Sequence, residues 1–121
     1  MLFVKTDDHA AGHVGCYGNE LLKTPNIDRL AREGTRFENA FVTNSLCAPS
    51  RATVLTGRYS HLYGIRENAE MKGQVENRNP SLVTYPQALQ AAGYRAGIVG
   101  KWHLSRDPVG FDTWRVRPGQ G

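Results

Sequence analysis

The sequence lacks the features that define several classes of protein. Its 121 residues include two cysteines, Cys16 and Cys47, too few for a framework of disulfide bonds. No apolar stretch approaches the roughly 20 residues that cross a membrane. Met1 leads directly into an apolar run at residues 2–4, without the pattern of a secretory signal. We therefore expect neither a disulfide scaffold nor a membrane partner, and a periplasmic or secreted location would need a signal in a longer protein.

Positive charge is in excess but is not clustered. The net charge is +4, and lysine and arginine never occur side by side. A nucleic-acid surface usually gathers such residues into a patch or stripe, so we expect no nucleic-acid partner. Hydrophobic residues make up 40% and charged residues 21%, which is an ordinary composition for one globular domain. The basic balance suits an anionic ligand.

One stretch, from Cys47 to Arg58, carries the strongest chemical signal. Pro49 fixes the backbone just after Cys47, Ser50 can cap a helix, and Gly57 can end it. A helix start offers free backbone N–H groups and the positive end of the helix dipole, which favour an anion. Arg51 lies four residues after Cys47 and adds a permanent charge on the same face. The pattern favours chemistry on a tetrahedral oxyanion, and its plain alternative is a buried structural cysteine.

Two acids follow the first apolar run. Residues 2–6 are expected to form a strand, and Asp7 and Asp8 come directly after it. In open α/β sheets, ligands collect beyond the carboxyl ends of the strands, and paired carboxylates are hard oxygen ligands for Ca²⁺ or Mg²⁺. Taken alone, such a pair is more often a solvated turn.

The threonine, proline and glycine signals in the rest of the sequence predict an alternation of helices and strands. Residues 24–34 and 84–93 each begin with threonine and proline signals and end at glycine, so both are expected to be helices. Residues 35–42 and 94–100 are expected to be strands, and residues 66–80 a polar surface loop. If the last strand continues, Lys101 and His103 share one face, where they could hold and protonate an oxyanion.

These motifs together resemble the type I sulfatases, in chain order and over nearly the whole sequence. The resemblance is carried by the Asp-Asp pair, the T-P-N-I-D-R-L-A-R-E-G helix, C-A-P-S-R with L-T-G-R, G-K-W-H-L, and G-F-D-T-W. It implies an α/β fold, an alkaline phosphatase-like parallel-sheet sandwich, of which residues 1–121 would be the N-terminal part. It also implies hydrolysis of sulfate esters, including sulfated carbohydrates.

The resemblance assigns roles to six residues. Asp7, Asp8 and Cys47 would bind the metal, Ca²⁺ rather than Mg²⁺. Cys47 would be oxidised to formylglycine by a formylglycine-generating enzyme, and its hydrated form would attack sulfur. Arg51 and Lys101 would hold this group and neutralise sulfate charge. His103 would take the proton from its second hydroxyl.

Further metal ligands and a distal histidine and lysine of the family have no counterpart in this sequence. The 121 residues alone are therefore expected to be an incomplete portion of a catalytic domain, inactive by itself and prone to self-association. Other interpretations stay open at this point. They are a phosphonate or phosphodiester hydrolase of the same superfamily, a non-catalytic metal-binding fragment, and a thiol-redox or anion-binding module.

Overall fold

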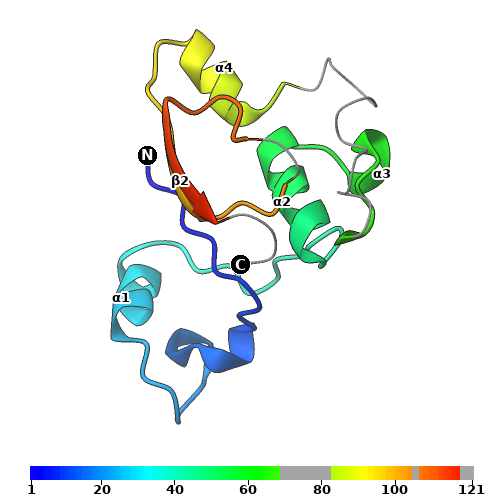
Figure 1. The fold of residues 1–121 in the computed structure, drawn as a ribbon. Helices are drawn as coiled ribbons and strands as arrows, with labels where there is room; N and C mark the ends of the chain where they lie inside the picture. Colours follow the sequence, from blue (N-terminus) through cyan, green and yellow to red (C-terminus); the bar gives the residue numbers. More distant parts are fainter. Residues whose placement is uncertain (69–82, 105–106, 118–121) are drawn as a thin grey trace. The chain divides into compact units, whose positions relative to one another are not determined.

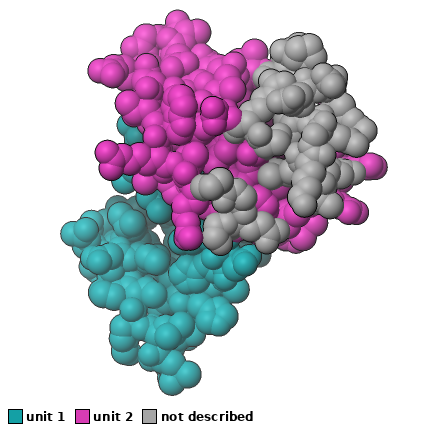
Figure 2. Space-filling model, in the orientation of Figure 1, with its two compact units in different colours: residues 1–41 teal, residues 42–121 magenta. Residues whose placement is uncertain are grey.

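The computed structural model describes residues 1–68, 83–104 and 107–117, and it divides into two compact units (Figures 1 and 2). The first unit comprises Met1–Phe41 and the second Val42–Gly121. Most of the polar loop expected at residues 66–80 lies outside the described residues. In the described part of the chain, no helix combines the length and the apolar character that crossing a membrane requires.

The first unit contains two short 3₁₀ helices and one α-helix. These are η1 (Ala11–His13), η2 (Gly15–Tyr17) and α1 (Pro25–Glu33). The helix predicted at residues 24–34 is thus confirmed, with Thr24 before its first residue and Gly34 after its last. Asp28 connects α1 to η2, because its Oδ1 accepts hydrogen bonds from the Cys16 N–H at 2.7 Å and from the Thr24 hydroxyl at 2.8 Å.

The apolar side chains of α1, which include Ile27 and Leu30, are not buried. Ile27 is 39% exposed and Leu30 is 66% exposed, and no residue of α1 is buried. The helix forms because its ends carry local capping signals, which act without tertiary contacts. Burial of these side chains needs an opposing apolar surface, and the described part of this unit supplies none.

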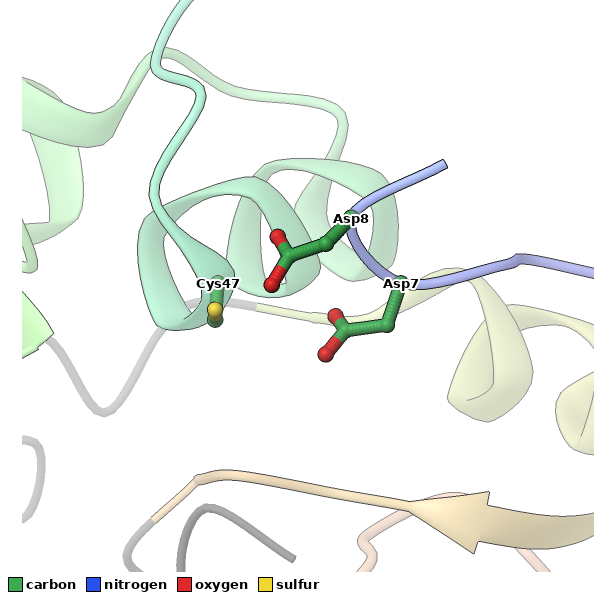
Figure 3. Close-up of side chains that lie close together, drawn as sticks. All are labelled: Asp7, Asp8 and Cys47. Carbon is green, nitrogen blue, oxygen red and sulfur yellow. The ribbon is translucent and has the colours of Figure 1, made fainter. Parts of the chain in front are cut away.

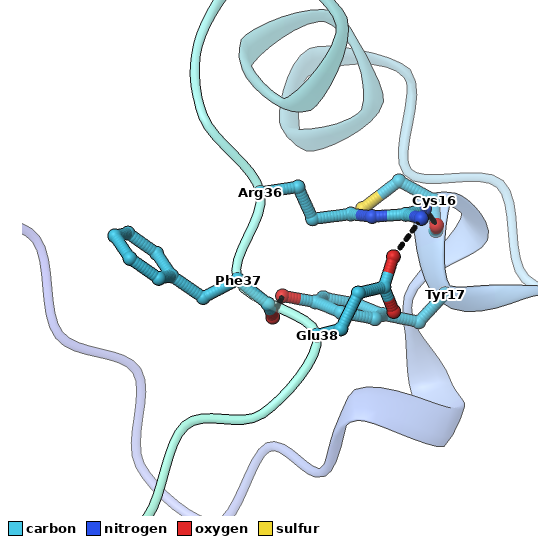
Figure 4. A network of polar contacts seen from close by, with 5 residues as sticks. All are labelled: Cys16, Tyr17, Arg36, Phe37 and Glu38. Carbon is cyan, nitrogen blue, oxygen red and sulfur yellow. Dashed lines mark hydrogen bonds and ion pairs between the residues drawn. The ribbon is translucent and has the colours of Figure 1, made fainter.

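A network of polar contacts around Arg36 joins the segment after α1 to η2 (Figure 4). The Arg36 guanidinium lies over the Tyr17 ring, 5.4 Å from its centroid, and pairs with Glu38 and the Cys16 carbonyl. The Tyr17 hydroxyl donates to the Phe37 carbonyl at 2.9 Å. Arginine stacked on an aromatic ring in this way fixes the segment after α1 without a strand.

The two strands predicted at residues 2–6 and 35–42 do not form. Both segments are fully described, and both lack secondary structure. Their apolar side chains are exposed, at 74% for Val4, 69% for Phe37 and 92% for Phe41. A strand is defined by hydrogen bonds to a neighbouring strand, and the described residues offer these segments no such neighbour.

In its described residues, the second unit combines three helices with a two-stranded parallel sheet. The helices are α2 (Cys47–Thr56), α3 (Ser60–Tyr63) and α4 (Tyr85–Ala91), and the strands are β1 (Gly97–Lys101) and β2 (Thr113–Arg117). The strands pair in parallel from Gly97 opposite Thr113 to Lys101 opposite Arg117. The helix predicted at residues 84–93 and the strand after it are confirmed, although the strand begins three residues later than expected, at Gly97.

Local hydrogen bonds start both α4 and the sheet. The capping box of α4 is formed by Thr84 and Gln87, with the Thr84 N–H donating to Gln87 Oε1 at 2.8 Å. At the entry to the sheet, Asp112 donates its N–H to the Ala96 carbonyl at 2.8 Å, and its carboxylate accepts the Ala96 N–H at 2.6 Å. This reciprocal pair sets the register of β1 against β2.

Two small cores lie among the described residues of the second unit. One contains Ala48, Ala52, Tyr63 and Ile65, between α2 and α3. The other contains Leu55, Trp102 and Phe111, with the two rings in an edge-to-face contact at 6.1 Å. Gly110 lies against the start of α4, where a Cβ at position 110 would come within 2.5 Å of the Gln87 nitrogen. Both cores use residues of α2, so this helix is the central element of the unit.

Candidate functional site

Cys47 is the first residue of α2, as the sequence predicted. The helix runs to Thr56, and Gly57 ends it in the left-handed conformation with φ 65°. Cys47 is half-buried, and no disulfide involves it or Cys16. Figure 3 draws its side chain at the start of the helix. The cysteine therefore has a defined position at a helix terminus and partial access to solvent, which a reactive group requires.

The first turn of α2 does not present the row of free N–H groups that the sequence suggested. Pro49 has no N–H, the Ala48 N–H donates to Asn68 Oδ1 at 3.1 Å, and the Ser50 N–H donates to the Leu46 carbonyl at 3.0 Å. Ser50 is inside the helix, and Leu46 precedes its first residue without a side-chain cap. Because these donors are already used, an anion here depends more on cationic side chains than on the backbone.

Arg51 connects α2 to the end of the sheet. It follows Cys47 by one turn, and its Nη1 donates to the Lys101 carbonyl at 2.6 Å. Lys101 is the last residue of β1 and is half-buried. One bond therefore joins the helix that bears Cys47 to the strand end that bears Lys101, within a single unit of the structure.

His103 follows two residues later, but not as a continuation of the strand. The strand ends at Lys101, and His103 has a positive φ of 52°. The shared face expected for Lys101 and His103 depended on the strand continuing through residue 103, and this condition is not met. His103 is 4% exposed, and its neighbour Trp102 is anchored against Phe111. The packed tryptophan holds the turn that carries the histidine.

Asp7 and Asp8 are both exposed and lie in the first unit (Figure 3). They follow an extended segment rather than the predicted strand, so the sheet edge does not position them. Adjacent carboxylates are still a suitable donor pair for a hard divalent cation. Their convergence with Cys47 stays a prediction, since the acids and the cysteine belong to different units.

Backbone strain coincides with two of these residues. Among the described residues, the non-glycine positions with positive φ are Asp8, at 49°, and His103. Such conformations cost about 1–3 kcal/mol and gather at functional sites, where surrounding contacts maintain them. Both positions are among the candidate site residues named from the sequence.

Sequence reasoning missed the side chains that support the turn before α2. Asn44 Oδ1 accepts the Leu46 N–H at 3.2 Å, and its Nδ2 donates to the Arg66 carbonyl at 2.9 Å. Asn68 and Tyr63 contact the first turn itself. Asparagine is a common turn residue, and its position three residues before the first residue of α2 could have identified Asn44. No local pattern points to Asn68 or Tyr63, whose partners are 14 to 20 residues away in sequence.

The fold and the site define a class: an α/β segment in which a helix that begins with a cysteine is bonded, through an arginine one turn later, to a strand end followed by a histidine. The family model for sulfatases matches residues 1–119, so this chain belongs to the sulfatase family. That match, together with the similarity to solved sulfatase structures, also confirms the predicted alkaline phosphatase-like α/β fold class.

Curated relatives align with most of this chain. An N-acetylglucosamine-6-O-sulfatase of Bacteroides thetaiotaomicron is 45% identical over 120 residues, which are 99% of this chain and 20% of the relative. The N-acetylgalactosamine-6-sulfatase of Homo sapiens is 38% identical over 98% of this chain and 25% of its own length. The chain thus spans about a fifth to a quarter of the curated relatives it matches.

Solved structures agree with this relationship. A protein solved in complex with its substrate D-glucosamine-2-N,6-O-disulfate aligns with a TM-score of 0.83 and 46% identity, over 94% of this chain and 22% of that chain. Ps i-CgsB in complex with k-i-k-neocarrahexaose aligns with a TM-score of 0.83 and 34% identity, over 93% of this chain and 26% of that chain.

Proposed function

We propose that this chain supplies the nucleophile-bearing part of an enzyme that hydrolyses sulfate esters. The observation that carries the proposal is the bond from Arg51 to the Lys101 carbonyl, which joins the Cys47 helix to the strand end before His103. A nucleophile, two cations and an imidazole are the groups that transfer of a sulfuryl group from an ester needs. The sulfatase relatives named above support this reaction over a phosphonate or phosphodiester substrate.

Cys47 would act after oxidation to formylglycine, whose hydrate carries two hydroxyl groups. The hydrate would supply one hydroxyl oxygen as the nucleophile toward sulfur. The bond from sulfur to the ester oxygen would break, and the alcohol would leave with the proton that this hydroxyl gives up. His103 then takes the proton of the second hydroxyl, so that the aldehyde reforms and sulfate leaves. Water restores the hydrate. Arg51 and Lys101 carry fixed positive charges that favour the sulfate oxygens as charge develops there.

Asp7 and Asp8 would hold a divalent cation together with a hydroxyl of the modified Cys47. The family implies a metal, and the exposed pair of carboxylates fits a hard cation with oxygen preference, Ca²⁺ before Mg²⁺. Such a cation would supply a positive charge beside the nucleophile. Asp7 and Asp8 would supply carboxylate oxygens to the cation. The positive φ of Asp8 turns the chain directly after Asp7.

The proposed substrate class is sulfated carbohydrate. The relatives named for N-acetylglucosamine and N-acetylgalactosamine sulfates, and the neighbour solved with a glucosamine disulfate, support it. The formylglycine-generating enzyme would be the second partner, because a cysteine does not become an aldehyde without an oxidising catalyst.

A chimeric enzyme tests the reaction. Residues 1–121 replace the matching segment of the Bacteroides thetaiotaomicron relative, and the chimera is produced together with a formylglycine-generating enzyme. The mass of the Cys47 peptide should fall as the thiol becomes an aldehyde, and the chimera should release sulfate from N-acetylglucosamine 6-sulfate. The matched control is the same chimera with Cys47→Ala. A folded chimera with the aldehyde in place and no sulfate release would contradict the proposal.

Metal binding is tested separately by calorimetry with Ca²⁺ and Mg²⁺ on the same chimera. Asp7→Asn and Asp8→Asn should each weaken binding at least tenfold. The control Asp107→Asn changes another exposed aspartate and should leave affinity unchanged. Equal affinity in all three variants would rule out the acids as ligands.

A further inference from the structure

Tyr63 is a buried tyrosine that the proposed reaction does not use. It is the last residue of α3, is 6% exposed, and packs with Ala48 and Ala52 of α2. Figure 1 shows α3 beside α2 in this unit. The two alanines are small and follow each other by one turn, so they allow the tyrosine ring to approach the helix closely.

The Tyr63 hydroxyl makes two bonds, both to α2. It donates to the Pro49 carbonyl at 2.7 Å. Because its single proton is used there, the Thr53 hydroxyl donates to it, at 2.6 Å. Burial raises the pKa of Tyr63, while the bond with Thr53 acts in the opposite direction, so the hydroxyl stays protonated at neutral pH.

These bonds contact α2 on one side and at successive turns. Residues 48 and 52 face Tyr63, and residues 49 and 53 bond its hydroxyl. Cys47 and Arg51 each precede one of the packed alanines by one position, which is about 100° around the helix. A rotation of α2 about its axis would therefore change the direction of Cys47 and move Arg51 away from the Lys101 carbonyl.

We propose that Tyr63, through Thr53 and the Pro49 carbonyl, sets the rotation of α2 and thereby the direction of Cys47 and Arg51. It is a positioning residue, and the proposal rests on the proposed function only in naming what is positioned. The ring supplies packing, and the hydroxyl supplies the directional part, because hydrogen bonds depend on angle whereas apolar contacts do not.

The first test uses this chain with its Cys47 thiol intact and does not require turnover. Tyr63→Phe keeps the ring and removes the hydroxyl. We expect alkylation of Cys47 by iodoacetamide to become about fivefold faster, which corresponds to the loss of one ordinary hydrogen bond. Cys16, in the other unit, is the internal reference and should react at an unchanged rate.

The chain offers matched controls. Tyr59→Phe makes the same chemical change at a tyrosine that is 58% exposed, and should have no effect. Thr53→Val should reproduce the effect of Tyr63→Phe, whereas Thr53→Ser keeps a hydroxyl and should react like the wild type. Adding Thr53→Val to Tyr63→Phe should give little further change, because Tyr63→Phe already removes the bond between Thr53 and Tyr63.

The outcomes separate positioning from general stabilisation. Faster amide exchange confined to the first turn of α2 supports the proposal. Equal alkylation in Tyr63→Phe and Tyr59→Phe would overturn it, and so would exchange that rises equally in α4 and β1. If Tyr63→Phe does not fold, the Thr53→Val and Thr53→Ser pair gives the same decision.

The second test uses the chimera described above. Tyr63→Phe should lower kcat about tenfold and leave KM within about twofold, because the nucleophile is misdirected while substrate contacts remain. A change confined to KM would overturn the proposal. A wild-type chimera without turnover would count against the proposed function alone, since the alkylation result still decides the role of Tyr63.

Discussion

The guanidinium of Arg51 donates to the backbone carbonyl of Lys101 across 50 residues of sequence, at 2.6 Å. This contact gives Arg51 a second task besides its charge, because it holds the end of β1 against α2. A bond from a charged donor to a half-buried carbonyl is worth about 1.5–3 kcal/mol. The arginine therefore stabilises the geometry in which it acts.

Replacing Arg51 with lysine separates these two tasks. Arg51→Lys keeps the positive charge but loses the planar fork and its fixed donor directions. We expect kcat of the chimera to fall about tenfold or more, and amide exchange at the end of β1 to become faster. Arg58→Lys is the control, as Arg58 is exposed just after α2. Wild-type exchange in Arg51→Lys would show that the bond does not hold the strand end.

Cys47 should tolerate no replacement in the chimera. Cys47→Ala should abolish turnover. Cys47→Ser has one hydroxyl, so it can accept the sulfuryl group but cannot expel sulfate by reforming an aldehyde. We expect one release of alcohol per enzyme and no steady-state rate, measured by rapid-quench kinetics. Cys16→Ser should behave like the wild type, and sustained turnover by the serine variant would contradict the two-hydroxyl mechanism.

Asn68 should stabilise α2 from outside the helix. Asn68→Ala leaves the Ala48 N–H without this acceptor, and we expect a loss of about 1 kcal/mol in the free energy of unfolding of the second unit. Asn68→Asp keeps an acceptor and adds a charge that the helix dipole favours, so it should restore stability. Urea titrations measure both variants. The control Asn26→Ala lies on an exposed position of α1 and should change little.

The sheet should lose a contribution to stability in acid. Two hydrogen bonds hold the pKa of Asp112 below its ordinary value. The bond from the Ala96 N–H has the larger effect, and the bond from the Gln90 side chain has the smaller one. Ionised Asp112 therefore stabilises the folded state above that ordinary pKa, about 3.9, and the contribution disappears as pH falls through the lowered pKa. Asp112→Asn should be less stable than the wild type near pH 7. The difference should shrink below about pH 4, and a constant difference across the range would exclude Asp112 as its source.

The 121 residues on their own should show weak Ca²⁺ binding, self-association and no sulfatase turnover. Ca²⁺ takes about 6–8 oxygen ligands. The proposed ligands in these residues are three: Asp7, Asp8 and a hydroxyl of the modified Cys47. Val99 of β1 is 81% exposed and Trp114 of β2 is 45% exposed, and their register places them on opposite faces of the strand pair. Both faces therefore carry exposed apolar surface, which favours pairing of copies. Light scattering across a concentration series and an aryl sulfate assay measure these properties. A monomer with turnover of about 1 per second or faster would contradict this expectation.

The helices were predictable from sequence because their signals are local. Thr24 with Pro25, and Thr84 with Gln87, act within one turn and need no distant partner. The strands at residues 2–6 and 35–42 were mispredicted because apolar runs show only that a strand would be stable if paired. Pairing depends on a partner that the described residues do not provide.

The candidate site likewise has features that follow from local sequence and features that depend on distant contacts. The one-turn spacing of Cys47 and Arg51 on a helix follows from sequence and is present in the structure. The left-handed turn at His103 was missed, because G-K-W-H-L reads as a continuing strand until the packing of Trp102 is known. Tyr63 and Asn68 act over 14 to 20 residues, and no spacing rule anticipates such contacts.

Gly110 limits how this chain can change during evolution. Its φ of 85° is costly for other residues, and a Cβ there would lie 2.5 Å from the Gln87 nitrogen. The nearest atom belongs to the backbone, so a larger residue could be accepted only if the start of α4 moved with it. In a library of variants selected for expression alone, without any assay of sulfate release, position 110 should therefore stay glycine while exposed positions such as Val99 diversify freely.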